Sequence, residues 1–111
     1  MASTVDQTAT KYLISISPDG RVRKEGIEKA PDHRLLNKIV GGYIEIIPYF
    51  HKYDGLSCVA FCNEDGKQMN LPRNHYAQKL WENAFGKPIT NDYLVGTIAI
   101  IAGPQSFLSQ L

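Results

Sequence analysis

The chain contains few of the residues that build disulfide-rich, metal-bound or membrane-spanning proteins. Two cysteines among 111 residues cannot form a disulfide framework. No apolar run reaches the roughly 18 residues that a transmembrane helix requires, and residues 1–10 lack the apolar core of a signal peptide. We therefore expect a cytoplasmic protein that is not attached to a membrane.

An excess of charge of one sign is also lacking. The chain has 12 basic and 11 acidic residues, which gives a net charge of +1. A protein this close to neutral generates no global field that would draw it onto nucleic acid or anionic lipid. The composition therefore argues against a nucleic-acid partner, although it is compatible with a local charged patch.

The residue types that bind metal ions are present but not at ligand spacing. Cys58 and Cys62 lie four residues apart in an expected strand, so their Cα atoms should be on the order of 13 Å apart, too far for a disulfide or a shared metal ion. The motifs CxxC, HxxxH and HExxH are absent, and the three histidines are scattered along the chain: His33, His51 and His75. We expect free thiols, no metal and no cofactor.

The middle of the chain carries the clearest signals of secondary structure. Asp32 precedes apolar residues at helical spacing, so its carboxylate can cap a short helix that Gly41 and Gly42 then end. Residues 43–47 are rich in β-branched and aromatic side chains, and Pro48 ends this run. We expect a strand there, at the centre of a sheet.

Alternating and helical patterns predict further elements on both sides of this stretch. The final element, at residues 93–102, is apolar on both faces, which indicates either a central strand covered on each side or an oligomer interface. In chain order the further elements are a strand at 12–17, an edge strand at 21–27, a strand at 56–62, a hairpin turn at 63–67 with a short return strand at 68–70, a helix at 75–85 and the final strand at 93–102.

The resulting order, ββαβββαβ, predicts the fold class. It indicates an α+β protein: a two-layer domain with a mostly antiparallel sheet of about five to six strands and two short helices on one face. A chain of this length forms one domain. We assign this domain to residues 11–103, with a flexible N-terminal tail at 1–10 and a C-terminal tail at 104–111, which Phe107, Leu108 and Leu111 could dock.

Several short motifs together resemble a known family. They are VGGYIE at 40–45, NEDGK at 63–67, LPRN at 71–74 followed by Ala77, Leu80 and Trp81, and LVG at 94–96. The combination resembles a small domain-of-unknown-function family common in bacteriophages, plasmids and bacterial genomes, over roughly residues 12–102. The aromatic segment at 49–55 and the extended termini depart from the family pattern. The resemblance implies an accessory protein of a mobile element, and it supplies no catalytic residues.

Two segments are candidates for a ligand or partner surface. The first is an aromatic segment that could stack on a base, or could instead pack onto the core. The second is the start of the 75–85 helix, where a cation, an amide and an imidazole could bind a small anion, or where Asn74 could simply cap the helix while Arg73 is solvated. The candidate residues are Tyr49, Phe50, His51, Tyr53, Arg73, Asn74 and His75.

The motifs that would identify an enzyme are absent, since there is neither a GxSxG elbow nor a phosphate-binding loop before a helix. We therefore expect a non-enzymatic protein of a phage or mobile element that binds a host protein, with a role against host defence, or that forms a homo-oligomer. The alternative is a protein that binds a small ligand, a nucleotide or a nucleotide-derived signal, between the two candidate segments.

Overall fold

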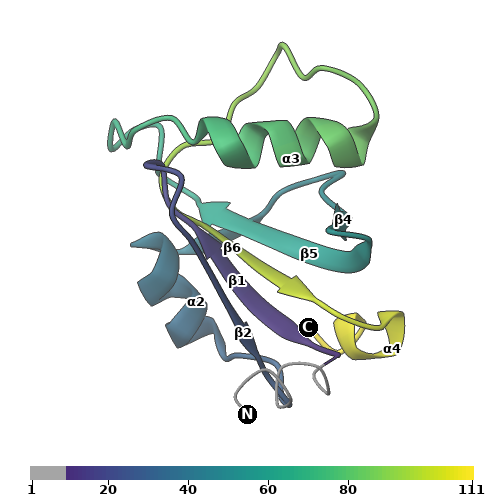
Figure 1. The fold of residues 1–111 in the computed structure, drawn as a ribbon. Coiled ribbons are helices and arrows are strands. Elements are labelled where there is room, and N and C mark those ends of the chain that lie inside the picture. The colour runs from purple at the N-terminus through teal and green to yellow at the C-terminus, as the bar shows by residue number, and fades with distance from the viewer. Residues whose placement is uncertain (1–9) are drawn as a thin grey trace.

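In the computed structural model, which describes residues 10–111, a twisted sheet lies between helices (Figure 1). The expected N-terminal tail at 1–10 lies outside the described residues except for Thr10. The elements in chain order are β1 (Tyr12–Ile16), β2 (Val22–Gly26), α2 (His33–Val40), β3 (Ile44–Ile46), β4 (Lys52–Tyr53), β5 (Leu56–Asn63), α3 (His75–Phe85), β6 (Ile98–Ala102) and α4 (Gln105–Leu108).

The sheet is antiparallel at every pairing between these strands. The strand order is β2-β1-β6-β5-β3, and β4 pairs with the beginning of β5. The predicted α+β class with a mostly antiparallel sheet is therefore confirmed.

The helices divide between the two faces of the sheet instead of sharing one. On one face, α3 packs on alternate residues of β1 and β6, in a core that includes Ala77, Trp81, Ile14, Ile16, Ile98 and Ile100. On the other face, α2 and α4 pack on the intervening residues, in a core that includes Leu36, Val40, Phe107, Leu108, Leu13, Ala99 and Ile101. Both faces are covered because these strands are apolar on both sides, and each face has to be kept from water.

The final strand occupies the centre of the sheet, as one of its two interpretations predicts. All five residues of β6 are fully buried, and the strand pairs with β1 on one side and β5 on the other. Its two apolar faces are thus covered within one chain, so β6 offers no surface to a second copy.

The prediction that residues 43–47 form a central strand is wrong in its position. The strand β3 spans only three residues and lies at the edge of the sheet, where its partner is β5. Glu45 and Ile46 are exposed, and Ile46 keeps 63% of its surface accessible. The central position belongs to β6 because β6 has no polar side chain on either face, whereas residues 43–47 include a glutamate that remains in water.

The connection between α2 and β3 has the predicted form. The side chain of Asp32 accepts a hydrogen bond from the Leu35 N–H at 2.9 Å, and Gly41 ends the helix with φ at +81°. Gly42 has no room for a side chain, since a Cβ there would lie 2.8 Å from the side-chain amide of Asn63. The double glycine therefore both stops the helix and lets the chain pass close to β5.

The predicted return strand at 68–70 is absent from the described chain, where a compact turn takes its place. Asn63 organises this turn, because its side-chain oxygen accepts from the Asp65 N–H at 2.8 Å and its carbonyl accepts from the Gly66 N–H at 3.1 Å. Met69 and Asn70 donate to the carbonyls of Asp65 and Lys67, and Leu71 donates to the Gly66 carbonyl. These local hydrogen bonds use backbone groups that a return strand would have offered to β5.

The predicted C-terminal tail is partly helical and packed. Residues 105–108 form α4, and its Phe107 and Leu108 are buried against the sheet, while Leu111 stays 43% exposed. The packed part of the chain thus extends beyond residue 103, because these two side chains complete the core on the face that α2 leaves partly open.

Candidate functional site

Two of the four candidate side chains in the aromatic segment pack onto the core. Phe50 is buried, and Tyr53 is half-buried against the same core. Tyr49 is exposed and lies beside Phe85 at the end of α3, with 5.2 Å between ring centroids. His51 is exposed, with its Nδ1 3.2 Å from the Tyr49 carbonyl. Of the four candidates in this segment, Tyr49 and His51 therefore remain available to a ligand.

Asn74 is a structural residue that joins three parts of the fold. It is 1% exposed, and its Oδ1 accepts from the Ala77 N–H at 3.1 Å to cap α3. Its amide donates to the carbonyls of Ile16 and Gly96, both at 2.9 Å. Because the whole amide is engaged inside the protein, Asn74 has nothing left to offer an anion.

The two predicted segments do not come together. Arg73 stacks on the Tyr93 ring, with its guanidinium carbon 4.0 Å from the centroid, just before α3 begins. Tyr49 contacts Phe85, the last residue of α3. The 11 residues of the helix lie between them, a length on the order of 16 Å. His75 is exposed at the Arg73 end. The geometry does not support one ligand site formed by these seven residues.

The two thiols are free and poorly reactive. Burial raises the pKa of Cys58 to about 12. Burial, followed in weight by the nearby charge of Glu45, raises the pKa of Cys62 to about 11. Both thiols remain protonated near neutral pH, and a protonated thiol is a weak nucleophile. Within residues 10–111, no three His, Cys, Asp or Glu side chains are grouped as a metal ion would need.

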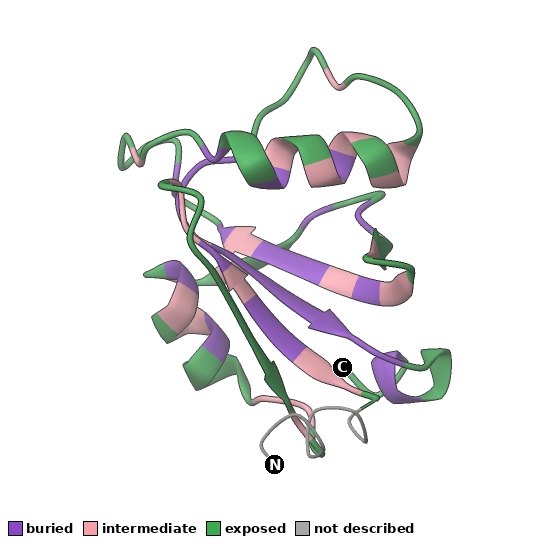
Figure 2. Cartoon of the chain, in the orientation of Figure 1, coloured by how far each residue is buried: buried purple, intermediate pink, exposed green. Residues whose placement is uncertain are grey.

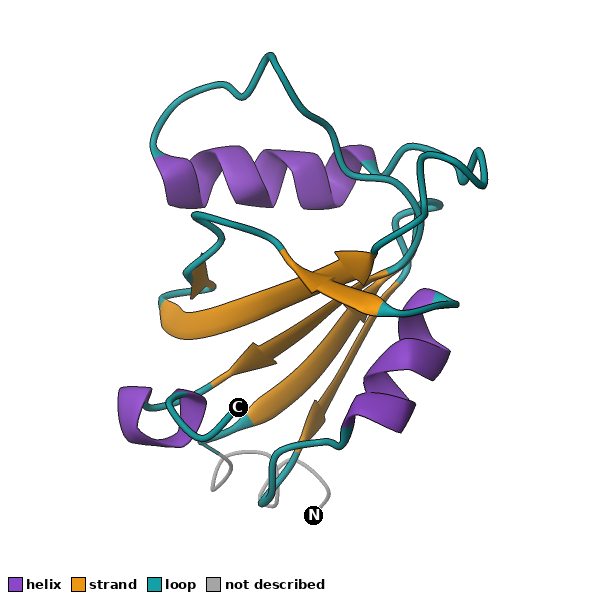
Figure 3. Cartoon of the chain, turned by 180° about the vertical axis from the view of Figure 1, so that it is seen from behind, coloured by secondary structure: helices purple, strands orange, loops and turns teal. Residues whose placement is uncertain are grey.

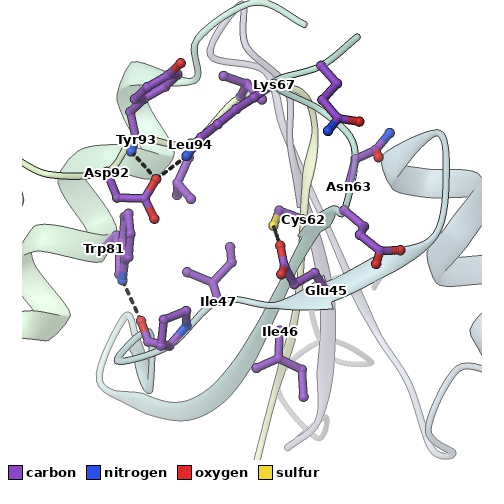
Figure 4. Close-up of a pocket in the computed structure, with 14 residues that line it drawn as sticks. Glu45, Ile46, Ile47, Cys62, Asn63, Lys67, Trp81, Asp92, Tyr93 and Leu94 are labelled. Atoms are coloured by element: carbon purple, nitrogen blue, oxygen red, sulfur yellow. Dashed lines mark hydrogen bonds and ion pairs between the residues drawn. The ribbon is translucent and has the colours of Figure 1, made fainter. Parts of the chain in front are cut away.

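Two hollows flank the edge strand β3, one on each face of the sheet. The first, which we call the polar cleft, has a volume of about 440 Å³ and lies between β3, the 63–68 turn, α3 and residues 92–95 (Figure 4). Its lining residues are Glu45, Ile46, Ile47, Pro48, Cys62, Asn63, Glu64, Lys67, Gln68, Trp81, Asp92, Tyr93, Leu94 and Val95.

The polar cleft carries excess negative charge. Lys67 is the one basic residue in its lining, and it forms an ion pair with Asp92. Partial burial acts to raise the pKa of Asp92, but hydrogen bonds from Lys67 and from the Tyr93 N–H outweigh it, and the net pKa is lowered. Glu45 and Glu64 have no ion pair within residues 10–111. Two negative charges therefore remain unbalanced in this lining.

The second hollow, which we call the apolar groove, lies on the opposite face of β3 and has a volume of about 840 Å³. It is lined by Ala30, Pro31, His33, Leu36, Asn37, Tyr43, Ile44, Ile46, Val59, Phe61, Leu108, Ser109, Gln110 and Leu111. Seen from behind, α2 and α4 lie at opposite ends of the sheet, at the right and the lower left of the view, with strands visible between them (Figure 3). Both helices pack on the same face of the sheet.

The rim of the apolar groove exposes large apolar side chains. Tyr43 and Ile46 keep 72% and 63% of their surface accessible, and Leu111 lies at the other side. The lining contains no Asp, Glu, Lys or Arg. A contiguous apolar surface rimmed by uncharged polar groups is typical of a protein interface.

The backbone of β3 is partly open to solvent. The Tyr43 carbonyl accepts from Glu64, and the Ile47 N–H donates to Ala60, so the odd-numbered residues bond to β5. Ile44 and Ile46 therefore direct their backbone groups away from the sheet. The Ile44 N–H is occupied by the Asn37 side chain at 3.2 Å. The open edge thus consists of the Ile44 carbonyl and both groups of Ile46.

Sequence reasoning missed this surface because its residues come from four separate elements. Strong β propensity and the pattern Tyr43-Ile44-Glu45-Ile46 indicated a strand, but propensity does not distinguish an edge from a centre. Two local signals were Glu45, which interrupts an otherwise apolar run, and Pro48, which follows that run. A short run with a charge inside it and a proline after it is typical of an edge strand.

Comparison with known protein families identifies a match over almost the whole described chain. A family model described as "Domain of unknown function (DUF3846)" matches residues 10–109. No curated protein and no solved structure matches. Separately, none of the helices within residues 10–111 is long and apolar enough to span a membrane.

Proposed function

The chain belongs to the family described as Domain of unknown function (DUF3846), and from its geometry we propose that it works by binding another protein at β3. The observation that carries this proposal is the exposure of Tyr43 and Ile46 on the rim of the apolar groove. These side chains lie beside the open backbone edge of Ile46, so a partner can contact side chains and main chain at one place.

The energetics favour this surface as an interface. Burying a side chain such as isoleucine stabilises a complex by roughly 1.5–3 kcal/mol, and aromatic residues dominate many interfaces. Tyr43 and Ile46 belong to the folded chain, on the rim of a groove whose lining includes the buried side chains of Leu36, Phe61 and Leu108. A partner would therefore gain apolar burial without ordering a loop, which keeps the entropic cost of binding low.

The resemblance extends the proposal to a biological setting. A protein of a phage or other mobile element, made in the cytoplasm of the host cell, would find its partner among host proteins. We propose that it acts there as a non-enzymatic accessory protein, for example against a component of host defence. The raised pKa values of both thiols support a role in binding over one in nucleophilic chemistry.

The proposal is tested by selection from a display library of random short peptides, with the wild-type protein and two variants as bait. Ile46→Asp places a charge on the apolar rim, whereas Val22→Asp makes the same change on β2, where Val22 is also exposed. We expect the wild type and Val22→Asp to enrich one family of apolar peptides that Ile46→Asp does not retain. Enrichment that is equal for all three baits, or absent for the wild type, would refute binding at β3.

A further inference from the structure

The side chains around β3 specify the chemistry of the partner segment. We infer that the partner presents an extended strand in which a lysine or arginine lies between two apolar residues, with the basic side chain opposite Glu45. This inference rests on the proposed function and narrows it to one class of partner. It follows from the direction of the β3 side chains and from the charge on its two faces.

The side chains of β3 alternate between the two hollows. Ile44 lines the apolar groove and Glu45 lines the polar cleft, where its Oε1 lies 3.9 Å from the Cys62 sulfur (Figure 4). Ile46 lines the apolar groove and also borders the polar cleft. In an added strand, directly opposite residues project from the same face of the sheet. Partner residues opposite the two isoleucines would therefore face the apolar groove, and the residue between them would face the polar cleft.

The charge of each hollow selects the partner side chain. The polar cleft has two unbalanced negative charges, and its one lysine is already engaged by Asp92. Glu45 is exposed and has no ion pair in the described part of the chain, so a basic residue opposite it gains an ion partner without displacing another. The lining of the apolar groove contains no Asp, Glu, Lys or Arg, so it favours apolar side chains of the partner.

A second copy of the chain fits this edge poorly. The outward hydrogen bonds of β3 come from Ile44 and Ile46, so Glu45 occupies the closely spaced position between hydrogen-bonded pairs. If two β3 strands paired in full around a two-fold axis, Glu45 would lie directly opposite its own copy. Like charges at this position are destabilising, which disfavours self-pairing and favours a different chain as the occupant.

The backbone of β3 limits how much an added strand can gain from hydrogen bonds. Asn37 already occupies the Ile44 N–H, so the main chain of a partner can use the Ile44 carbonyl and the two groups of Ile46. A ladder this short does not hold a peptide of arbitrary sequence. Side chains in the two hollows must therefore supply the selectivity, and the pattern of apolar, basic and apolar residues should matter more than peptide length.

The test uses two synthetic peptides with blocked ends that differ at one position. Both carry the same valine-flanked centre and the same neutral flanks, and the central residue is lysine in one and glutamate in the other. Fluorescence anisotropy at low salt gives Kd for the wild type, Glu45→Lys and the matched control Glu25→Lys, whose glutamate lies on β2. We expect the wild type to prefer the lysine peptide on the order of tenfold, and Glu45→Lys to reverse this preference. Glu25→Lys should behave as the wild type.

The possible outcomes distinguish failure of the basic-residue inference from failure of the proposed binding at β3. Equal affinity for the two peptides, or a preference that Glu45→Lys leaves unchanged, would overturn the basic-residue inference while binding at β3 stands. No binding of either peptide would also overturn it, and the library selection with Ile46→Asp would then decide binding at β3 independently. A wild-type dimer in sedimentation that Ile46→Asp dissociates would assign the edge to a second copy and overturn the inference as well.

Discussion

The two edges of the sheet have opposite chemistry. At one edge, all five residues of β2 are exposed, and Arg23, Lys24 and Glu25 form most of the strand (Figure 2). Its Lys24 also lies 4.4 Å above the Tyr12 ring and 3.9 Å from a carboxylate oxygen of Asp54. At the other edge, β3 is short, with an isoleucine on each side of Glu45, and it lies between two hollows.

This difference suggests that the residues of an edge strand indicate whether the strand is protected against pairing or available for it. Charged residues on an edge strand oppose pairing with another chain, which is how many sheet proteins avoid aggregation. The strand β2 follows that pattern, whereas β3 and the residue before it keep Ile46 and Tyr43 on the surface. The strand β3 limits the risk through its short length, the charge of Glu45 and the bond from the Ile44 N–H to Asn37. We interpret β2 as an edge protected against pairing and β3 as one kept for a partner.

The largest expected effect is a loss of stability on substitution of Asn74, at the start of the helix that lines the polar cleft beside β3. Asn74→Ala removes the cap of α3, which walls the polar cleft, and leaves the Ile16 and Gly96 carbonyls without their side-chain donor. We expect the free energy of unfolding to fall by about 2–4 kcal/mol in urea denaturation.

The matched control for this change is Asp32→Ala. It removes a cap from α2 whose carboxylate is exposed and accepts from one backbone N–H, that of Leu35. We expect a loss of about 1 kcal/mol. An equal loss for the two variants would show that the two buried bonds of Asn74 contribute nothing.

Secondary structure was more accessible from the sequence than the arrangement of strands. The caps Asp32 and Asn74 and the existence of the strand β6 could be predicted because each depends on residues close in sequence. The predicted range of that strand, 93–102, was too long, since β6 begins only at Ile98. The edge position of β3 could not be predicted, since it depends on β6 pairing with both β1 and β5. For the same reason Phe50 was a candidate ligand residue and proved to be buried.

A smaller effect is expected when one more backbone group of β3 is made available to a partner. Asn37→Ala removes the acceptor that occupies the Ile44 N–H. We expect the free energy of unfolding to fall by about 1 kcal/mol. The affinity for the lysine peptide should rise a few-fold, because the freed Ile44 N–H can donate to the peptide.

The control for this variant lies beside β2. Asp19→Ala removes a comparable acceptor, the carboxylate oxygen that accepts a hydrogen bond from the Arg21 N–H, and it should leave peptide affinity unchanged. Titration of both variants with the lysine peptide measures the difference. A fall in affinity for Asn37→Ala would mean that Asn37 supports the binding surface and does not compete for it.

The smallest expected effect is the acid dependence of stability on the β3 side. The pKa of Asp92 is lowered from 3.8 in the folded chain. Its stabilising contribution is therefore present above the unfolded pKa and is lost as the pH falls through the folded value. Thermal unfolding between about pH 6 and about pH 2 should show a shallower acid loss for Asp92→Asn than for the wild type.

The comparison for this prediction is Asp54→Asn, which removes the carboxylate paired with Lys24 beside β2. This exposed pair should contribute little to stability. An acid profile of Asp92→Asn that overlays the wild type, or one that Asp54→Asn reproduces, would remove the distinction between the two pairs.

Hydrogen exchange of the backbone amides, with and without the lysine peptide, tests most directly whether β3 is the binding edge. The account predicts slower exchange of the Ile46 amide on binding, because this N–H points outward and acquires an acceptor, and unchanged exchange along β2. Protection along Val22–Gly26 with none at Ile46 would contradict it.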